Sequence, residues 1–402
     1  MSTGRLETHE MSKGLVFLVP GFFGFTSLGS VSYFERVECF LAAALARRGY
    51  AARVVRCATQ PTASIPRRAE LLRRQVLRHG GLRADELHFV GHSTGGLDVR
   101  MLLTPGVRLR GNVDRNIGER IAERTRSAIS VATPNHGTPL ASHFLTLDGQ
   151  TLLLILSGLA TSSPGRRTVQ AAAAAVALAA RLDDWLGRDE GPLDRVAAGL
   201  LRRIRADHRD PVWKYLREIE RDQGAVLQLT PEGMELFNAA VADRPGVAYV
   251  CIAAAAPDPG SQPAGLELAD PEYLALRSLF RGLHALASRP HRRYAPPGPD
   301  ASIRRALRRA LGFAPSAASN DGFVPLYSQL HGHLLHAARA DHLDLVGHFS
   351  LAGGRTADWL PSGAGYTSDD FDRTWNAVAD AIAAVPRRRP AQAISDRPRL
   401  RA

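Results

Sequence analysis

Short apolar runs along the chain are separated by longer segments in which apolar residues recur every three or four positions. The recurring positions predict helices over residues 33–48, 66–79, 272–287, 303–311 and 369–385, with a further helix opening at Leu97. The apolar runs predict strands over residues 14–20, 50–57, 87–90, 127–133, 247–256 and 333–338. Runs without polar alternation are typical of strands buried on both faces. The pattern therefore predicts an α/β fold with a mostly parallel central sheet and helices on both faces.

The regular alternation is interrupted after Thr133, which predicts a core divided by insertions. Residues 1–139 are assigned to the N-terminal part of the core, and residues 140–246 to a mainly helical cap or lid. That insertion contains the apolar run Leu152 to Leu156 and an alanine-rich segment over residues 169–186. Residues 247–385 are assigned to the C-terminal part of the core. A second insertion, rich in proline and arginine, lies within it over residues 257–319. Residues 386–402 form a basic tail that we expect to be disordered.

The charge adds little to this picture. The 402 residues carry a formal net charge of +12, and the only lysines are Lys13 and Lys214. Arginine-rich codon usage with a solvated basic surface accounts for such a balance, and transient attraction to an anionic lipid surface is the functional alternative. No nucleic-acid recognition motif accompanies the charge, so we expect no nucleic acid as partner.

The cysteines and the absence of targeting signals bear on the compartment. Cys39, Cys57 and Cys251 lie too far apart for a zinc site or a disulfide framework, and we expect them to be buried small hydrophobic residues. The sequence has no recognisable secretory signal and no apolar stretch long enough to span a bilayer. These features predict a cytoplasmic protein.

One motif carries candidate chemistry. Residues 91–95 read Gly-His-Ser-Thr-Gly, between a predicted strand and a predicted helix. A strand that turns sharply into a helix holds the central serine out at the edge of a sheet, as a nucleophile requires. The earlier loop Gly21-Phe22-Phe23-Gly24 also follows a strand, and its backbone N–H groups are candidates for stabilising a developing oxyanion. We therefore expect Ser93 to be a nucleophile.

A serine nucleophile needs a base, and the base needs an orienting acid. After a strand-to-helix serine, the expected chain order is serine, acid, histidine. Asp321 in Asn-Asp-Gly-Phe-Val-Pro is assigned as the acid and His342 as the base. Asp341 and Asp344 are weaker candidates for the acid, because immediate neighbours of a histidine rarely face its ring.

Other histidines leave alternatives open. His348 is a second candidate base, whereas His92 is expected to support packing. His136 is either a wall of the site or a hydrogen-bonded loop residue. A metal cluster is a weak alternative for His331, His333 and His336, because strand alternation would bring at most His331 and His333 to one face.

Taken together, these stretches resemble the α/β-hydrolase superfamily, and within it the bacterial triacylglycerol lipases and related esterases. The resemblance extends from end to end of the chain, over residues 19–25, 91–96, 132–138, 229–238, 320–325 and 341–344. It implies the triad Ser93, Asp321 and His342, and an oxyanion hole formed by the N–H groups of Phe22 and Thr94. It departs from the family at Pro20, where histidine is usual, but a backbone donor does not depend on that side chain.

The resemblance implies no organic cofactor, and no metal ligands are assigned. Some relatives bind a structural calcium ion through an aspartate two residues after the catalytic histidine. Asp344 matches that position, but no partner carboxylate can be identified within the altered second insertion.

The expected function is hydrolysis of lipid-like acyl esters through an acyl-enzyme. An acyltransferase or a polyester depolymerase is the alternative within acyl chemistry. A catalytically inactive hydrolase-fold binding protein is the alternative of another class. Acyl length, head group and oligomeric state are left open by the sequence.

Overall fold

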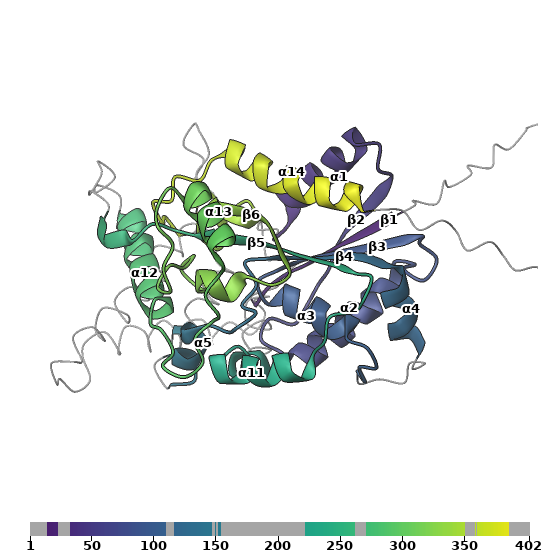
Figure 1. Ribbon diagram of the computed structural model, residues 1–402, viewed down its shortest axis with the longest axis horizontal. Helices are drawn as coiled ribbons and strands as arrows, with labels where there is room; N and C mark the ends of the chain where they lie inside the picture. The colour runs from purple at the N-terminus through teal and green to yellow at the C-terminus, as the bar shows by residue number, and fades with distance from the viewer. Residues whose placement is uncertain are drawn as a thin grey trace, which may run out of the picture.

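The computed structural model describes residues 14–22, 33–109, 116–146, 149, 152–153, 222–261, 271–349, 358 and 360–385, and its central element is a six-stranded sheet (Figure 1). The spatial order of the strands is β2-β1-β3-β4-β5-β6. Every neighbouring pair is parallel, which agrees with the predicted sheet. The strands are β1 (Gly14–Val19), β2 (Ala52–Arg56), β3 (Glu86–His92), β4 (Thr125–Val131), β5 (Ala248–Ala255) and β6 (His333–Arg339).

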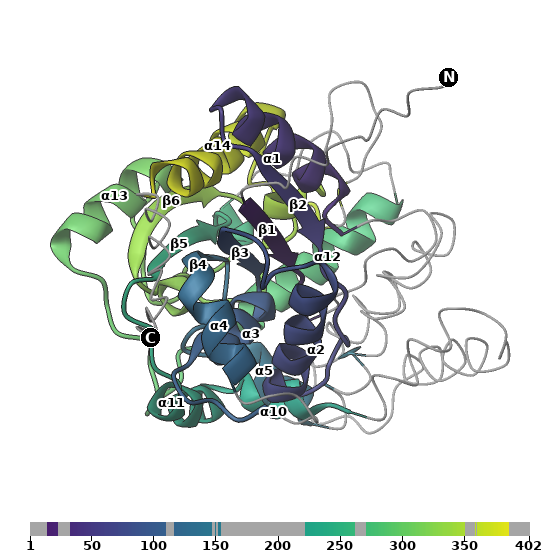
Figure 2. The ribbon, with the colours of Figure 1, turned by 90° about the vertical axis from the view of Figure 1, so that its right-hand side faces the viewer.

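Helices cover both faces of this sheet. Figure 2 shows α1 (Glu35–Arg47) and α14 (Ser368–Ala384) over one face, and α2 (Ile65–Arg78), α3 (Thr94–Leu103) and α4 (Asn116–Arg124) over the other. Alternate residues of β1 enter different cores: Val16 and Leu18 pack on the α1 and α14 side, and Phe17 packs on the α2 and α3 side. This two-sided burial explains why the strands are continuous apolar runs.

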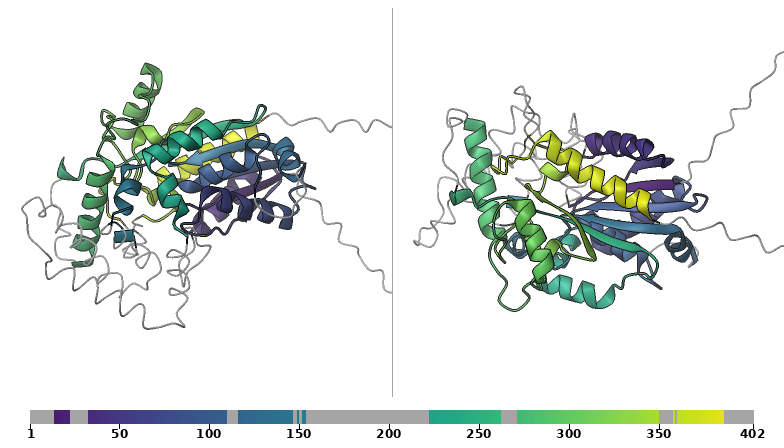
Figure 3. Two further views of the ribbon diagram at one scale, coloured as in Figure 1. Left: turned by 90° about the horizontal axis from the view of Figure 1, so that it is seen from below. Right: turned by 45° about the horizontal axis from the view of Figure 1, so that its top comes forward.

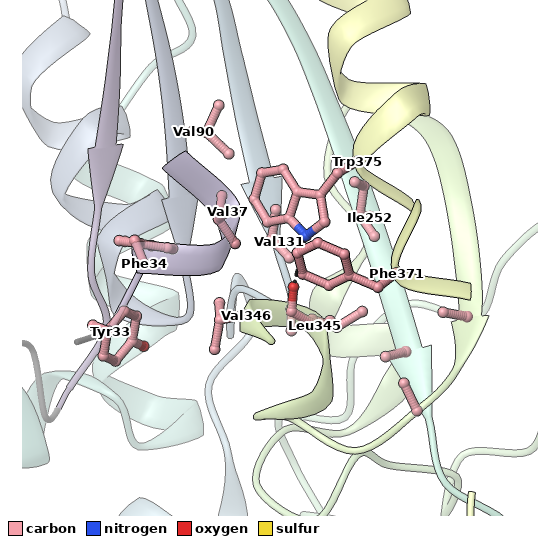
Figure 4. Packing of buried hydrophobic residues seen from close by; sticks show 14 of the residues in the cluster. Tyr33, Phe34, Val37, Val90, Val131, Ile252, Leu345, Val346, Phe371 and Trp375 are labelled. Carbon is pink, nitrogen blue, oxygen red and sulfur yellow. Dashed lines mark hydrogen bonds between the residues drawn. The ribbon is translucent and has the colours of Figure 1, made fainter. Parts of the chain in front are cut away.

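The first and last helices of the core lie side by side, as Figure 3 shows for α1 and α14. Figure 4 shows how α14 is anchored. Trp375 is fully buried, and its indole N–H donates to the carbonyl oxygen of Leu345 at 2.9 Å. Leu345 belongs to the short 3-10 turn η5 (Asp344–Val346). Helix α14 therefore fixes the η5 turn, which follows His342 in the segment after β6.

Only the two ends of the expected insertion over residues 140–246 are described. They contain α5 (Pro139–Phe144), α10 (Gly224–Gln228) and α11 (Pro231–Ala240). Leu152 and Leu153 are buried in the same core as α1 and α14. The rest of the 152–156 run, the segment 169–186 and the tail 386–402 lie outside the described residues. Within the described ranges, no helix combines the length and the apolar character needed to cross a bilayer.

The second insertion contributes the 3-10 turn η2 (Pro259–Ser261) and the helices α12 (Pro271–Ala287) and α13 (Ala301–Leu311). The 3-10 turn η4 (Leu326–Gln329) follows it. Helix α13 packs on the edge strand β6 through Leu307 and Leu311. Because α13 leads toward residue 321, this packing fixes the direction from which the Asp321 loop enters the site.

Two local expectations differ from the structure. Helix α4 is missing from the sequence prediction, because only Ile121 and Ala122 of this polar segment are buried. Cys39 is exposed, whereas Cys57 and Cys251 are buried as expected. Cys39 follows Val37 on α1 by two residues, about 200° around the helix axis. It therefore faces away from the buried stripe that contains Val37 and Leu41.

Candidate active site

Ser93 lies at the tight turn between β3 and α3, in a conformation that few side chains adopt. Its φ is 54° and its ψ is −131°. Outside glycine, a positive φ is uncommon and costs free energy that the surrounding structure must supply. The Ser93 N–H donates to the carbonyl oxygen of Val131 in the neighbouring strand at 2.8 Å. The residue as a whole keeps 7% of its surface exposed, so Ser93 is held at the carboxyl end of the sheet within reach of solvent.

The turn requires close approaches that only glycine permits. A Cβ added to Gly95 would lie 2.9 Å from the carbonyl oxygen of Pro20 and in severe contact with that of Val19. One added to Gly21 would lie 2.5 Å from the Ser93 Cβ and 3.1 Å from its Oγ. The loop after β1 is thus packed directly against the serine, as expected for a loop that supplies an oxyanion donor.

Asp321 and His342 are joined by a short polar contact. The His342 Nδ1 lies 2.6 Å from the Asp321 Oδ2, with both residues buried. Asp321 also accepts from the N–H groups of Phe323 and Val324 at its Oδ1, and from Gln329 at its Oδ2. A carboxylate accepting this many bonds is held in one orientation, so it favours the Nδ1–H form of His342 and leaves Nε2 to accept a proton.

The base loop is tied to the serine turn through the main chain. His92 Nε2 lies 3.0 Å from the carbonyl oxygen of His342, and the two imidazole rings are 4.6 Å apart. The His342 N–H donates to the carbonyl oxygen of Asp321 at 3.0 Å. These contacts bring the three residues that the sequence assigned to catalysis to one edge of the sheet.

The two expected oxyanion donors are the residues that follow Gly21 and Ser93 in the sequence. Thr94 is the first residue of α3, where backbone N–H groups have no partner within the helix. Phe22 follows Gly21, whose carbonyl oxygen accepts from the Arg68 Nη2 at 3.1 Å. The chain has no cis peptide bond among the described residues. The N–H of Phe22 therefore points away from Arg68, because C=O and N–H are opposed in a trans peptide.

Arg68 of α2 is a fully buried arginine close to the loop after β1. It pairs with Asp98 of α3, also fully buried, at 2.9 Å, and donates to the carbonyl oxygen of Pro20 at 2.8 Å. Burial raises the pKa of Asp98 to about 6, and the nearby Arg68 opposes that rise. The pair links two helices to the loop after β1, so it stiffens one wall of the site.

Three carboxylates gather on the far side of His342. Ligand oxygens of Asp341, Asp344 and Asp358 all lie within 4.8 Å of one another. The Asp341 Oδ2 is buried without a hydrogen-bond partner. Burial, and then the nearby Asp358, raise the pKa of Asp341 to about 8. An unpartnered buried oxygen among carboxylates fits a hard cation such as Ca²⁺, so these residues suit the structural calcium of the resembled family.

The other candidates have different surroundings. Asp341 and Asp344 accept backbone N–H groups of their own turn instead of facing the His342 ring. His331 is bound to Asp243 at 3.0 Å. The N–H of His136 donates to the Ser328 hydroxyl at 3.0 Å. In the described part of the chain, the cluster of three carboxylates is the only group with metal-ligand spacing, which leaves His331, His333 and His336 without support as a metal site.

Sequence reasoning missed Arg68, Asp98 and Asp358, and it considered Asp341 only as an alternative acid. A signal existed for two of them. Arg68 falls within the spacing of Ile65, Ala69 and Leu72 on the buried face of α2, and Asp98 stands between Leu97 and Val99. Opposite charges on two apolar helix faces predict a buried pair. The sequence gives no comparable indication that Asp358 lies close to Asp341 and Asp344, the neighbours of His342.

Comparison with solved structures finds lipases and esterases. Lipase 1 from Pelosinus fermentans is similar to the chain with a TM-score of 0.52 and 16% sequence identity, covering 94% of this chain and 100% of that one. Staphylococcus hyicus lipase gives 0.49 and 16%, covering 96% and 98%. A metagenomic carboxyl esterase gives 0.48 and 16%, covering 92% and 76%. No protein-family model matches the sequence, and no curated protein does. The likeness to the Pelosinus lipase, with the parallel sheet, shows that the chain has the α/β-hydrolase fold.

Proposed function

We propose that the chain is a serine hydrolase that cleaves carboxylic esters with lipid-like acyl groups. The observation that carries the proposal is the buried Asp321–His342 pair, 2.6 Å apart, held beside the strained Ser93 turn. A hydrogen-bonded acid and base next to a serine with positive φ is the arrangement that nucleophilic acyl transfer requires. The solved lipases of the same fold agree with this chemistry.

The proposed reaction has two halves. The His342 Nε2 takes the hydroxyl proton of Ser93 as its Oγ attacks the ester carbonyl carbon. The N–H groups of Phe22 and Thr94 stabilise the oxyanion, and His342 returns the proton to the leaving alcohol oxygen. Water then attacks the acyl-serine with His342 as base. The carboxylic acid leaves, and Ser93 regains its proton.

Aromatic rings near the reacting groups favour an apolar acyl chain. The half-buried Phe323 ring lies 5.2 Å from the His342 ring, and the half-buried Phe22 ring stacks on Phe144 at 6.5 Å. Covering such apolar surfaces with an acyl chain is favourable, by about 25 cal/mol per Å² of apolar surface buried. The insertion over residues 140–246 is proposed as the cap of this site, since α5 supplies Phe144 at its start.

Asp341, Asp344 and Asp358 are the residues that would hold a calcium ion. Bound there, the ion would neutralise carboxylates packed beside the base and fix the turn that carries His342. The ion takes no part in the acyl chemistry. Residues of the chain perform every proposed proton transfer.

Turnover of p-nitrophenyl esters of graded acyl length, by the wild type and by Ser93→Ala, tests the proposal. The wild type should release p-nitrophenol and free acid, with a preference for longer chains. Ser93→Ala should lower kcat by on the order of a thousandfold or more, because the nucleophile is lost.

Product analysis with added alcohol tells hydrolysis from acyl transfer, since a transferase would yield mainly the new ester. A folded wild type that cleaves none of the esters would support the inactive binding protein instead. Undiminished turnover by Ser93→Ala would contradict the assignment of the nucleophile.

A further inference from the structure

Buried hydrogen bonds that do not involve the Ser93 hydroxyl join the three loops of the site through Tyr33. Tyr33 lies just before α1, and only 6% of its surface is exposed. The N–H of Gly21 donates to its hydroxyl oxygen at 3.2 Å, and that oxygen lies 2.6 Å from the His92 Nδ1. His92 in turn reaches the carbonyl oxygen of His342 through its Nε2 at 3.0 Å. The series runs from the loop after β1, through the end of β3, to the loop after β6.

Chemistry fixes the direction of each bond. A carbonyl oxygen can only accept, so the His92 Nε2 must carry a proton and donate to His342. Burial lowers the pKa of His92 well below its ordinary value, and the nearby His342 adds to this shift, so the ring is neutral and Nδ1 carries no proton. The Tyr33 hydroxyl must then donate to Nδ1 while it accepts from Gly21. One hydroxyl thus satisfies the oxyanion loop and sets the tautomer of His92.

We infer that Tyr33 is a positioning residue that holds the Phe22 oxyanion donor and, through His92, the His342 loop in register with Ser93. The inference rests on the proposed function, because the register matters only if Ser93 attacks an ester.

The peptide units around Gly21 show how the hydroxyl would act. Tyr33 holds the Gly21 N–H, and Arg68 holds its carbonyl oxygen. Fixing both sides of Gly21 fixes the plane of the following peptide, which carries the Phe22 N–H. Gly21 also contacts the Ser93 side chain, so a small shift of this loop changes the distance from donor to oxyanion directly. Errors of about 1 Å in such geometry cost on the order of a hundredfold in rate.

Tyr33→Phe tests the inference because it removes the hydroxyl and keeps the ring, which packs edge-on against Phe34 at 4.8 Å. The structure offers a matched control in Tyr50, a buried tyrosine whose hydroxyl lies 2.7 Å from the Nε2 of buried His88. The Tyr50 pair lies at the opposite end of the sheet, beside Gly14 at the start of β1. Tyr50→Phe therefore removes a buried tyrosine–histidine contact far from Ser93, together with the bond that the hydroxyl donates to the Glu86 carboxylate at 2.9 Å.

The decisive readout compares an ester with its thiono analogue, in which sulfur replaces the carbonyl oxygen. Sulfur is a weak acceptor on a longer bond, so well-placed oxyanion donors favour the oxygen ester. In Tyr33→Phe, kcat for the oxygen ester should fall about tenfold to a hundredfold with little change in KM, and the preference over the thiono ester should shrink. Tyr50→Phe should lower the melting temperature and leave that preference at the wild-type value.

Two results would overturn the inference: an unchanged preference in Tyr33→Phe, or an equal change in Tyr50→Phe. Nitrogen-15 spectra of the histidine rings give a test that needs no activity, with His92→Asn used to assign the signals. The wild type should show His92 protonated at Nε2, and Tyr33→Phe should shift its Nδ1 resonance. A wild-type ring protonated at Nδ1 would refute the series of bonds. Absence of Ser93-dependent ester cleavage in the wild type would instead refute the proposed function, before any tyrosine variant is compared.

Discussion

The buried carboxylate of Asp321 accepts several hydrogen bonds in addition to its contact with His342. It has no exposed surface, and its two oxygens accept from two backbone N–H groups, one glutamine and the His342 ring. Hydrogen bonds to a charged acceptor are stronger than neutral ones, so this set fixes the carboxylate in the orientation from which its charge can stabilise a protonated His342. The role requires the charge as well as the shape.

Asp321→Asn keeps the shape and removes the charge. We expect kcat to fall by on the order of a thousandfold to ten-thousandfold, because the imidazolium loses its stabilising anion. Steady-state ester turnover measures the effect, and circular dichroism checks that the variant is folded. Activity within tenfold of the wild type would show that another carboxylate orients the base.

Asp344→Asn is the matched control for that substitution. Asp344 accepts the N–H of Asp341 and lies in the carboxylate cluster instead of against the His342 ring. Its effect should therefore resemble that of removing divalent cations from the wild type with a chelator. A large loss in Asp344→Asn that chelation does not reproduce would give Asp344 a direct role beside the base.

At the scale of single residues, the site residues that could be predicted are those that lie in a recognisable short motif. Ser93 is identified by its motif and Asp321 by its turn, and the structure brings both residues together with His342. Tyr33 could not be found this way, since its partners Gly21 and His92 are 12 and 59 positions away. Nothing in the sequence near Tyr33 distinguishes it from an ordinary core tyrosine.

At the scale of elements, the central strands β1, β3 and β4 were predicted because both of their faces are buried, whereas the edge strands β2 and β6 keep exposed residues. The strand β3 shows this throughout its length, Glu86 to His92. The first half of β3 also contains a polar cluster that the apolar pattern does not indicate. His88 is fully buried, with its Nε2 2.7 Å from the Tyr50 hydroxyl and its Nδ1 2.8 Å from the Ser127 hydroxyl. Helix α4 was missed because most of its residues are polar and only Ile121 and Ala122 are buried.

The buried His88 predicts acid sensitivity of the sheet. Burial, and then the nearby Arg126, lower the pKa of His88 to about 4 in the folded chain. An unfolded chain binds this proton below about pH 6.5, so between pH 6.5 and 4 the unfolded state holds more protons and stability falls as the pH falls. Complete passage through that window should cost about 3 kcal/mol at 1.36 kcal/mol per pKa unit.

His88→Asn isolates this contribution. The variant should be less stable than the wild type at pH 7, because it loses buried hydrogen bonds. Its melting temperature should nevertheless fall less than that of the wild type between pH 7 and 4.5. Parallel melting curves for the two proteins across this range would argue against a neutral, buried His88.

At the scale of the whole molecule, the parallel sheet assembles the site from distant parts of the chain. The loop after β1, the Ser93 turn after β3 and the His342 loop after β6 all leave the carboxyl ends of strands, which meet at one edge. This convergence could be predicted from strand order in the sequence. The carboxylate cluster could not, because Asp358 is distant in sequence from Asp341 and Asp344 and no motif connects it to them.

The most direct test of the account is to map where a fluorophosphonate reacts with the intact chain. The probe phosphonylates only a serine that a neighbouring base activates. We predict one adduct per chain, found by peptide mass spectrometry on Ser93, with labelling abolished in Ser93→Ala and slowed by on the order of a thousandfold in His342→Ala. An adduct on another residue, or unchanged labelling in a folded His342→Ala variant, would contradict the assignment of Ser93 and His342 as nucleophile and base.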